Sequence, residues 1–152
     1  MNGALAGLSA TDLAVAAGKA ALEGIDADVI DRVIVGNVVS AGLGMNLARQ
    51  IGLRLELPID RPAMTVNMMC ASGMQAVVLA VQSIQTGESR VVLCGGTESM
   101  SNAPHLLDRA RTGYRLGDGT LTDIMSGEQF DLIQGSARVP FRAGQVRAFD
   151  VR

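Results

Sequence analysis

The spacing of apolar residues along the first hundred residues predicts helices that alternate with strands. Ser9 and Asp12 have the spacing of a capping box, in which each side chain accepts a hydrogen bond from the other residue's backbone N–H. An apolar stripe follows at helical period, formed by Leu13, Ala16, Ala17, Ala20 and Ala21. Gly24 is a natural end for this helix, and residues 31–39, rich in β-branched side chains, predict a strand.

Two further pairs of helix and strand follow. Asn46 predicts the cap of a helix that runs to about residue 55, and residues 64–67 predict a second strand. Residues 71–86 are apolar on almost every side, which predicts a helix buried between layers. Residues 90–94 are apolar without alternation, as in a central parallel strand. This order predicts an α/β fold with a mostly parallel sheet and right-handed crossovers.

The pattern changes after Pro104. We predict a first α/β domain over residues 1–107 and a partial or irregular second unit over residues 108–152. Residues 108–128 carry charges and glycines without a sustained period, which predicts an extended surface loop. Two apolar segments nearer the C-terminus predict a short hairpin around residues 143–144.

Composition and charge favour a folded protein that does not bind nucleic acid. The chain of 152 residues is 48% hydrophobic and 18% charged, with a net charge of −2, so it offers no basic surface for nucleic acid or anionic lipid. No apolar run approaches the roughly 20 residues needed to span a bilayer. Cys70 and Cys94 lack a zinc-ligand pattern and predict free thiols in a reducing compartment. We therefore expect a soluble, cytoplasmic protein.

Cys70 is the strongest candidate for chemistry. The predicted strand 64–67 leads into this cysteine, and the predicted helix begins directly after it. Unpaired N–H groups and the helix dipole at a helix N-terminus both favour a thiolate, which is the nucleophilic form. The small residues at positions 71–73 leave room for a substrate. The alternative is a buried structural thiol, since free cysteine is often buried.

The other candidate residues favour structural roles. Cys94 at a strand end predicts a small core residue. A catalytic Cys–His pair of Cys70 with His105, the only histidine, is an alternative that the family resemblance described below disfavours. Glu98 predicts a carboxylate that braces a loop. The glycines of residues 36–44 lack the spacing of a dinucleotide loop. A group of methionines beside Cys70 predicts pliable core packing, namely Met64, Met68, Met69 and Met74.

Three motifs in order resemble the thiolase family of acyl-CoA acyltransferases. V-N-M-M-C-A-S-G at residues 66–73 is similar to its nucleophilic-cysteine motif. G-N-V-V-S-A-G-L-G-M-N-L-A-R-Q at residues 36–50 is similar to its glycine loop and N-x-A-R-Q helix start. G-G-T-E-S-M-S-N-A-P at residues 95–104 is similar to its G-G-x-E-S-M-S-x-A-P turn. The resemblance implies a thiolase-like N-terminal half-fold in which a buried helix follows the nucleophile Cys70.

The resemblance also implies what the chain acts on. Cys70 would attack an acyl-CoA or 3-ketoacyl-CoA carbonyl to form an acyl-enzyme, and the acyl group would pass to CoA or to a second acetyl-CoA. The substrates would be CoA thioesters, in lipid metabolism such as fatty acid β-oxidation, with no metal or redox cofactor. The direction of the reaction and the acyl chain length stay open. A ketoacyl-synthase-like condensation is the runner-up chemistry, which the motif wording fits less well.

Several family features are missing from the sequence. No G-H-P motif, which carries the activating histidine, and no C-x-G-x-G motif, which carries the acid/base cysteine, occurs in the 152 residues. The first strand of the family, which the resemblance implies is central in the sheet, also has no counterpart. We therefore expect a chain truncated at both ends, and either a non-catalytic thiolase-like fragment or a half-enzyme that needs a separate C-terminal half remains an alternative. Unpaired strand edges and exposed apolar surface predict a homo-oligomer or aggregate.

Overall fold

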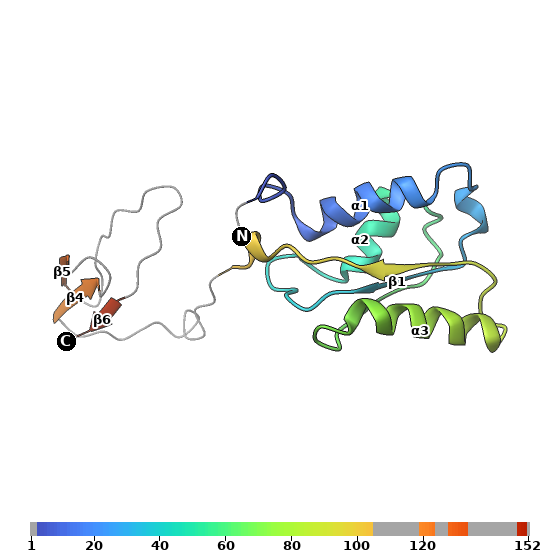
Figure 1. Cartoon of the computed structure of the whole chain (residues 1–152). Helices are drawn as coiled ribbons and strands as arrows, with labels where there is room; N and C mark the ends of the chain where they lie inside the picture. The colour runs from blue at the N-terminus through green and yellow to red at the C-terminus, as the bar shows by residue number, and fades with distance from the viewer. Residues whose placement is uncertain (1–2, 105–118, 124–127, 134–148, 152) are drawn as a thin grey trace. The chain divides into compact units, whose positions relative to one another are not determined.

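The computed structural model describes residues 3–104, 119–123, 128–133 and 149–151. The chain divides into two compact units, Met1–His105 and Leu106–Arg152, which are described one at a time (Figure 1). None of the helices in the described ranges is long and apolar enough to cross a membrane.

A parallel sheet forms the centre of the first unit, as the sequence predicts. Within residues 3–104 the strands β1 (Arg32–Gly36), β2 (Ala63–Val66) and β3 (Val92–Gly96) pair in the order β2-β1-β3, all parallel. Helices α1 (Ala10–Ala21) and α2 (Leu47–Arg54) lie on one face of this sheet, and α3 (Ser72–Gln85) lies on the other (Figure 1). Short 3₁₀ helices follow α1 and β3, at η1 (Ala27–Val29) and η2 (Met100–Asn102).

The central strand β1 alternates its side chains between the two faces. Val33 and Val35 join Ile51 of α2 in the larger core cluster, whereas Ile34 joins Ala76 and Ala80 of α3 in the smaller one. All six side chains are buried. A strand covered on both faces is the arrangement that parallel sheets require, because each crossover places a helix over the sheet.

The predicted caps are confirmed, but the predicted apolar face of α1 is wrong. Ser9 and Asp12 form the capping box, and the Asn46 side chain accepts from the Arg49 N–H to cap α2. The residues of α1 that pack on the core are Ala14, Val15 and Gly18, together with Leu22 at its C-cap, and not the predicted stripe. The helix itself was predicted correctly, but the side of it that packs on the core was not. Alanine is small and occurs on both sides of this helix, so its positions do not identify the buried side.

The alanines of the predicted stripe face solvent or a cavity instead of the core. Ala16, Ala17, Ala20 and Ala21 are exposed, and Ala17 and Ala21 line an apolar cavity of about 130 Å³ between α1 and the end of β3. Gly18 makes the close contact: a Cβ there would lie 2.7 Å from Cδ1 of Leu55.

The prediction that the helix after Cys70 is buried on all sides is also wrong for this chain. Helix α3 buries only small side chains, namely Ser72, Ala76, Ala80 and Ser83. Its larger residues Val77, Val78, Val81 and Ile84 are between 40% and 47% exposed. The sheet covers one side of α3, and no described element of the first unit covers the other, so the apolar character of that side does not lead to burial here.

No gap interrupts the sheet where a missing central strand was expected. Strand β1 pairs with β2 through Val33 and Ala63, and directly with β3 through Val33 and Leu93. The unpaired edges within residues 3–104 are therefore the outer sides of β2 and β3, and not two strands that flank a gap. The aligned start of β1 and β3 is further held by Asp31, whose side chain accepts from the Arg90 and Val91 N–H groups.

The second unit contains a small antiparallel sheet. Its described strands are β4 (Gly119–Asp123), β5 (Gln129–Leu132) and β6 (Phe149–Val151), paired in the order β5-β4-β6. Strand β4 falls in the segment 108–128 that was predicted as a loop, so that prediction is wrong at these five residues. The turn expected at residues 143–144 lies outside the described residues, and β6 pairs with β4.

Candidate active site at the start of helix α3

Glycines place the first turn of α3 directly against the sheet. A Cβ at Gly36, the last residue of β1, would lie 2.3 Å from the backbone carbon of Ser72. A Cβ at Gly96, the last residue of β3, would lie 2.9 Å from Cα of Gly73. Gly36 and Gly96 are partners in the strand register. Only residues without a side chain allow this approach, which sets the start of α3 on the carboxyl edge of the sheet.

The turn that carries Cys70 is strained and braced from both sides. Met69 has a φ of 53°, a left-handed conformation that costs a non-glycine residue roughly 1 kcal/mol or more. Its N–H donates to Oδ1 of Asn67 at 3.1 Å, and its carbonyl accepts from the Ser72 hydroxyl at 2.6 Å. The Ser72 oxygen also accepts from the Met68 N–H at 2.9 Å. The polar side chains on either side of Cys70 therefore fix the backbone at the cysteine.

Cys70 is exposed and lines a cavity of about 600 Å³. Three segments form the cavity: the residues after β1, the turn into α3, and the residues after β3. They are Gly36, Asn37, Val38, Val39, Met69, Cys70, Ser72, Gly73, Gly96, Thr97, Glu98 and Met100. This volume falls in the range of small-molecule sites. The alternative of a buried structural thiol does not hold for Cys70.

Glu98 joins two of these segments, in the bracing role that the sequence predicts. Its Oε2 accepts from the Val38 N–H at 2.8 Å, and its Oε1 accepts from the Val39 N–H at 3.1 Å and from Nδ2 of Asn37 at 2.9 Å. Asn37 is 2% exposed, and its Nδ2 also donates to the Thr97 carbonyl at 3.0 Å. Both partners of Nδ2 are acceptors, which fixes the orientation of the amide. Oδ1 of Asn37 is buried without a hydrogen-bond partner among the described residues.

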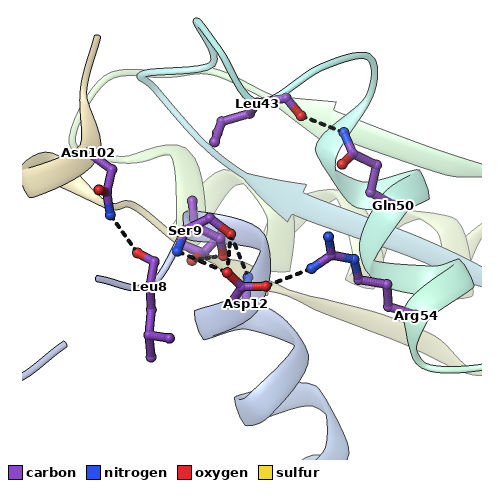
Figure 2. A network of polar contacts seen from close by, with 9 residues as sticks. Leu8, Ser9, Asp12, Leu43, Gln50, Arg54 and Asn102 are labelled. Carbon is purple, nitrogen blue, oxygen red and sulfur yellow. Dashed lines mark hydrogen bonds and ion pairs between the residues drawn. The ribbon is translucent and has the colours of Figure 1, made fainter. Parts of the chain in front are cut away.

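The segment after β3 is tied in turn to the N-terminal residues. The Thr97 hydroxyl donates to the Ala10 carbonyl at 2.7 Å, and the Ser99 hydroxyl donates to the Leu8 carbonyl at 2.8 Å. Figure 2 shows Asn102 reaching Leu8, to whose carbonyl its Nδ2 donates at 2.8 Å. The G-G-T-E-S-M-S-N motif therefore fixes the cavity wall after β3 to the residues at the start of α1 through hydrogen bonds.

The N-x-A-R-Q motif has a supporting role as well. Nε2 of Gln50 donates to the carbonyls of Leu43 and Met45, which shapes the glycine-containing loop after β1 (Figure 2). The Arg49 guanidinium donates to the carbonyls of Arg61 and Ile59, and so holds the turn before β2. These side chains position the loops around the cavity and do not line it.

The other residues singled out in the sequence do not share the position of Cys70 in the structure. Cys94 is half-buried against Ile34, Ala76 and Ala80, and burial raises the pKa of its thiol. The prediction that Cys94 is a core residue is confirmed. His105 lies outside the described residues. The prediction of methionine core packing is wrong, because Met68, Met69 and Met74 are more than half exposed and Met64 is 39% exposed.

Sequence reasoning missed Asn37, Asn67 and Ser72 as parts of the site. Asn67 lies three residues before Cys70 and Ser72 lies two residues after it, and such polar side chains often bond the backbone of a turn. That spacing could have identified them. Asn37 lies far from Cys70 in the sequence, and the parallel pairing of β1 with β2 brings it to the cysteine turn, while the pairing of β1 with β3 brings it to Glu98.

Comparisons with known proteins assign the family. The family profile described as the N-terminal domain of thiolase matches residues 1–137. An acetyl-CoA acetyltransferase of Escherichia coli K12 is 50% identical over 127 residues, which cover 82% of this chain and 32% of that protein. One from Cupriavidus necator is 45% identical over 126 residues, again 82% of this chain and 32% of that protein.

Two solved structures share the fold. The Acat5 thiolase of Ascaris suum, solved in complex with coenzyme A, superposes with a TM-score of 0.70 at 42% identity, over 72% of this chain and 29% of that one. The acetyl-CoA acetyltransferase of Syntrophomonas wolfei gives 0.71 at 43% identity, over 77% and 30%. The chain belongs to the thiolase family, as its N-terminal domain, and the predicted α/β thiolase-like fold is confirmed. It spans about a third of the length of these relatives.

Proposed function

We propose that the protein is a thiolase-type acyltransferase and that Cys70 is its acyl-accepting nucleophile. The observation that carries the proposal is the placement of an exposed thiol at the start of α3, on the wall of a 600 Å³ cavity, in a turn whose backbone is fixed on both sides. The acetyl-CoA acetyltransferases that match this chain support CoA thioesters as the substrate class.

The proposed first half-reaction is transfer of an acyl group from CoA to Cys70. The Cys70 thiolate forms a bond to the thioester carbonyl carbon, the bond from that carbon to the CoA sulfur breaks, and the CoA thiolate leaves with the electron pair and takes up a proton. The sulfur of a CoA molecule that has lost its proton, or the deprotonated α-carbon of a second acetyl-CoA, then forms a bond to the acyl carbon, the bond to the Cys70 sulfur breaks, and the Cys70 thiolate is regenerated. Acyl transfer changes no oxidation state, so we propose no redox cofactor. The bond changes above involve a thiolate and protons, and we propose that no metal takes part.

For this chain we propose the first half-reaction, acylation of Cys70. We propose the complete reaction for a thiolase as long as the relatives. The chain spans about a third of those relatives and carries no G-H-P or C-x-G-x-G motif. General acid/base groups commonly contribute about 10²–10⁴-fold to a rate, so acylation by this chain alone is expected to be slow.

Mass spectrometry after incubation with acetyl-CoA tests the proposal. We expect one acetyl group on the peptide that contains Cys70, and none in a Cys70→Ser variant. A Cys94→Ser variant, which keeps Cys70, should be acetylated like the wild type. Acetyl groups on Cys94, or none on any cysteine after prolonged incubation, would contradict the assignment of Cys70 for this chain.

We also propose that the protein associates with itself and acts in the cytoplasm, in fatty acid β-oxidation or a related thioester pathway. The apolar side of α3, with Val77, Val81 and Ile84 each at least 42% exposed, supports association. Free thiols at Cys70 and Cys94 support a reducing compartment. Size-exclusion chromatography should show a dimer or larger species that shifts toward monomer in a Val81→Lys variant. Identical elution of the two proteins would contradict association through α3.

A further inference from the structure

Two walls of the Cys70 cavity are joined by one side chain. Glu98 follows β3, and its carboxylate accepts hydrogen bonds from the segment that follows β1: from the Val38 N–H, the Val39 N–H and Nδ2 of Asn37, at 2.8, 3.1 and 2.9 Å. These partners are about 60 residues away in the sequence. Both carboxylate oxygens receive N–H donors, a geometry that holds the backbone of residues 38–39 against the end of β3.

The same segment contacts the turn that carries the thiol. The carbonyl of Val38, whose N–H bonds Glu98, accepts from Nδ2 of Asn67 at 3.3 Å. The other end of that amide, Oδ1 of Asn67, accepts from the Met69 N–H at 3.1 Å. Met69 is the strained residue directly before Cys70. A continuous run of hydrogen bonds therefore leads from Glu98 through Val38 and Asn67 to the backbone next to the nucleophile.

We propose that Glu98 is a positioning residue for Cys70, which acts by fixing the wall at residues 37–39 and, through Asn67, the turn before the thiol. The proposal rests on the function proposed above, in which the acyl group must reach the Cys70 sulfur in a defined orientation. Glu98 does not transfer protons in this account. Its contribution is orientation, and misplacement of a reacting group by about 1 Å can cost about 10²-fold in rate.

A Glu98→Gln variant should break this arrangement with little change in size. A glutamine presents one oxygen and one NH₂ group, so it leaves an N–H of residues 38–39, or the Asn37 amide, facing another donor. Glu88→Gln is the matched control, because it makes the same chemical change at an exposed glutamate that pairs with Arg32 and does not line the cavity.

The structural part is tested by amide NMR on the full chain. In Glu98→Gln we expect faster hydrogen exchange at Val38 and Val39 together with shifted amide resonances of Met69 and Cys70, and neither change in Glu88→Gln. If Val38 and Val39 exchange faster while Met69 and Cys70 keep their resonances, Glu98 braces only its own wall and the proposal is overturned.

The role of Glu98 in acylation is tested by comparing two reactions of the Cys70 thiol. Iodoacetamide needs only an exposed Cys70, whereas acetyl-CoA also needs the oriented wall, so Glu98→Gln should lower the acetylation rate about tenfold or more and leave alkylation near the wild-type rate. Equal losses in both reactions would show a merely structural role and would overturn the proposal.

An Asn67→Ala variant keeps the test decisive if Glu98→Gln does not fold. Asn67 is exposed, and its removal breaks the run between the wall and the turn while leaving Glu98 bound to residues 37–39. We expect a lower ratio of acetylation to alkylation with unchanged exchange at Val38 and Val39. An unchanged ratio of acetylation to alkylation would overturn the positioning role. So would a wild type that is not acetylated, if the Met69 and Cys70 resonances also do not respond to Glu98→Gln. A wild type that is not acetylated but shows the NMR coupling would instead contradict only the proposed function.

Discussion

The two faces of the parallel sheet differ in how completely they are covered. On the face of α1 and α2, large side chains such as Ile30, Ile51 and Leu57 are buried in one cluster. On the face of α3, the buried contacts of the helix come from alanines, serines and glycine, while its valines and Ile84 stay partly exposed. The first face therefore holds a core of large side chains, with the 130 Å³ cavity beside α1, whereas the second is a close backbone contact with apolar side chains on the outer side of α3.

This difference teaches how the site is built. Large side chains between α3 and the sheet would hold the helix further away, because packed helices and sheets are spaced by the side chains between them. Small residues instead bring the first turn of α3 onto Gly36 and Gly96, and so place Cys70 at the carboxyl edge of the sheet. The core on the α1 and α2 face therefore stabilises the fold, and the close contact on the α3 face positions Cys70.

The largest expected effect tests where the stability lies. Ile51→Ala removes a side chain that is 2% exposed in the α1 and α2 core, and should lower the free energy of unfolding by about 2–5 kcal/mol. Val81→Ala, at a residue that is 47% exposed on α3, should cost less than about 1 kcal/mol. Urea denaturation measures both. Similar losses for the two variants would show that the outer side of α3 is covered.

A glycine substitution tests the close contact on the other face. Gly36→Ala places a Cβ 2.3 Å from the backbone of Ser72, which cannot move without shifting α3, so the variant should lose about 3 kcal/mol of stability and change the reactivity of Cys70. Gly7→Ala is the control, since a Cβ at Gly7 meets no atom within 4 Å. Thermal unfolding that gives equal values for Gly36→Ala and Gly7→Ala would argue against the contact.

The smallest expected effect concerns acid stability at the start of α1. Hydrogen bonds from the Ser9 side chain and backbone, and then the Arg54 guanidinium, lower the pKa of the Asp12 carboxyl below its ordinary value. Because the pKa is lower in the folded chain, this stabilisation is present above the unfolded pKa and is lost as pH falls through the folded pKa. An Asp12→Asn variant should therefore lose stability near neutral pH and show a shallower decline between about pH 5 and pH 2. The same acid decline in Asp12→Asn and wild type would contradict this assignment.

Much of the fold was predictable because its signals are local. The capping box at Ser9, the Asn46 cap and the β-branched strand each depend on neighbouring residues. Both caps are confirmed, and the strand predicted over residues 31–39 forms over the shorter range Arg32–Gly36. The buried face of α1 and the exposure of α3 were not predictable in the same way. Both depend on which elements contact a helix, and the helix sequence specifies its apolar side without specifying what covers it.

The candidate site shows the same division. Cys70 stood out because strand, thiol and small residues are consecutive, and Glu98 was recognised as a bracing carboxylate. The partners of Glu98 could not be predicted from spacing, because residues 37–39 reach it only through the direct pairing of β1 with β3.

Competitive alkylation of the two thiols tests the central claim most directly, namely that the start of α3 presents a reactive nucleophile while the layer beneath the helix holds an inert thiol. Limiting iodoacetamide near neutral pH, followed by peptide mass spectrometry, gives the order of modification in the folded chain. We expect Cys70 to be modified first, because it is exposed, whereas burial raises the pKa of the Cys94 thiol and so lowers its thiolate fraction. Faster modification of Cys94 would contradict it.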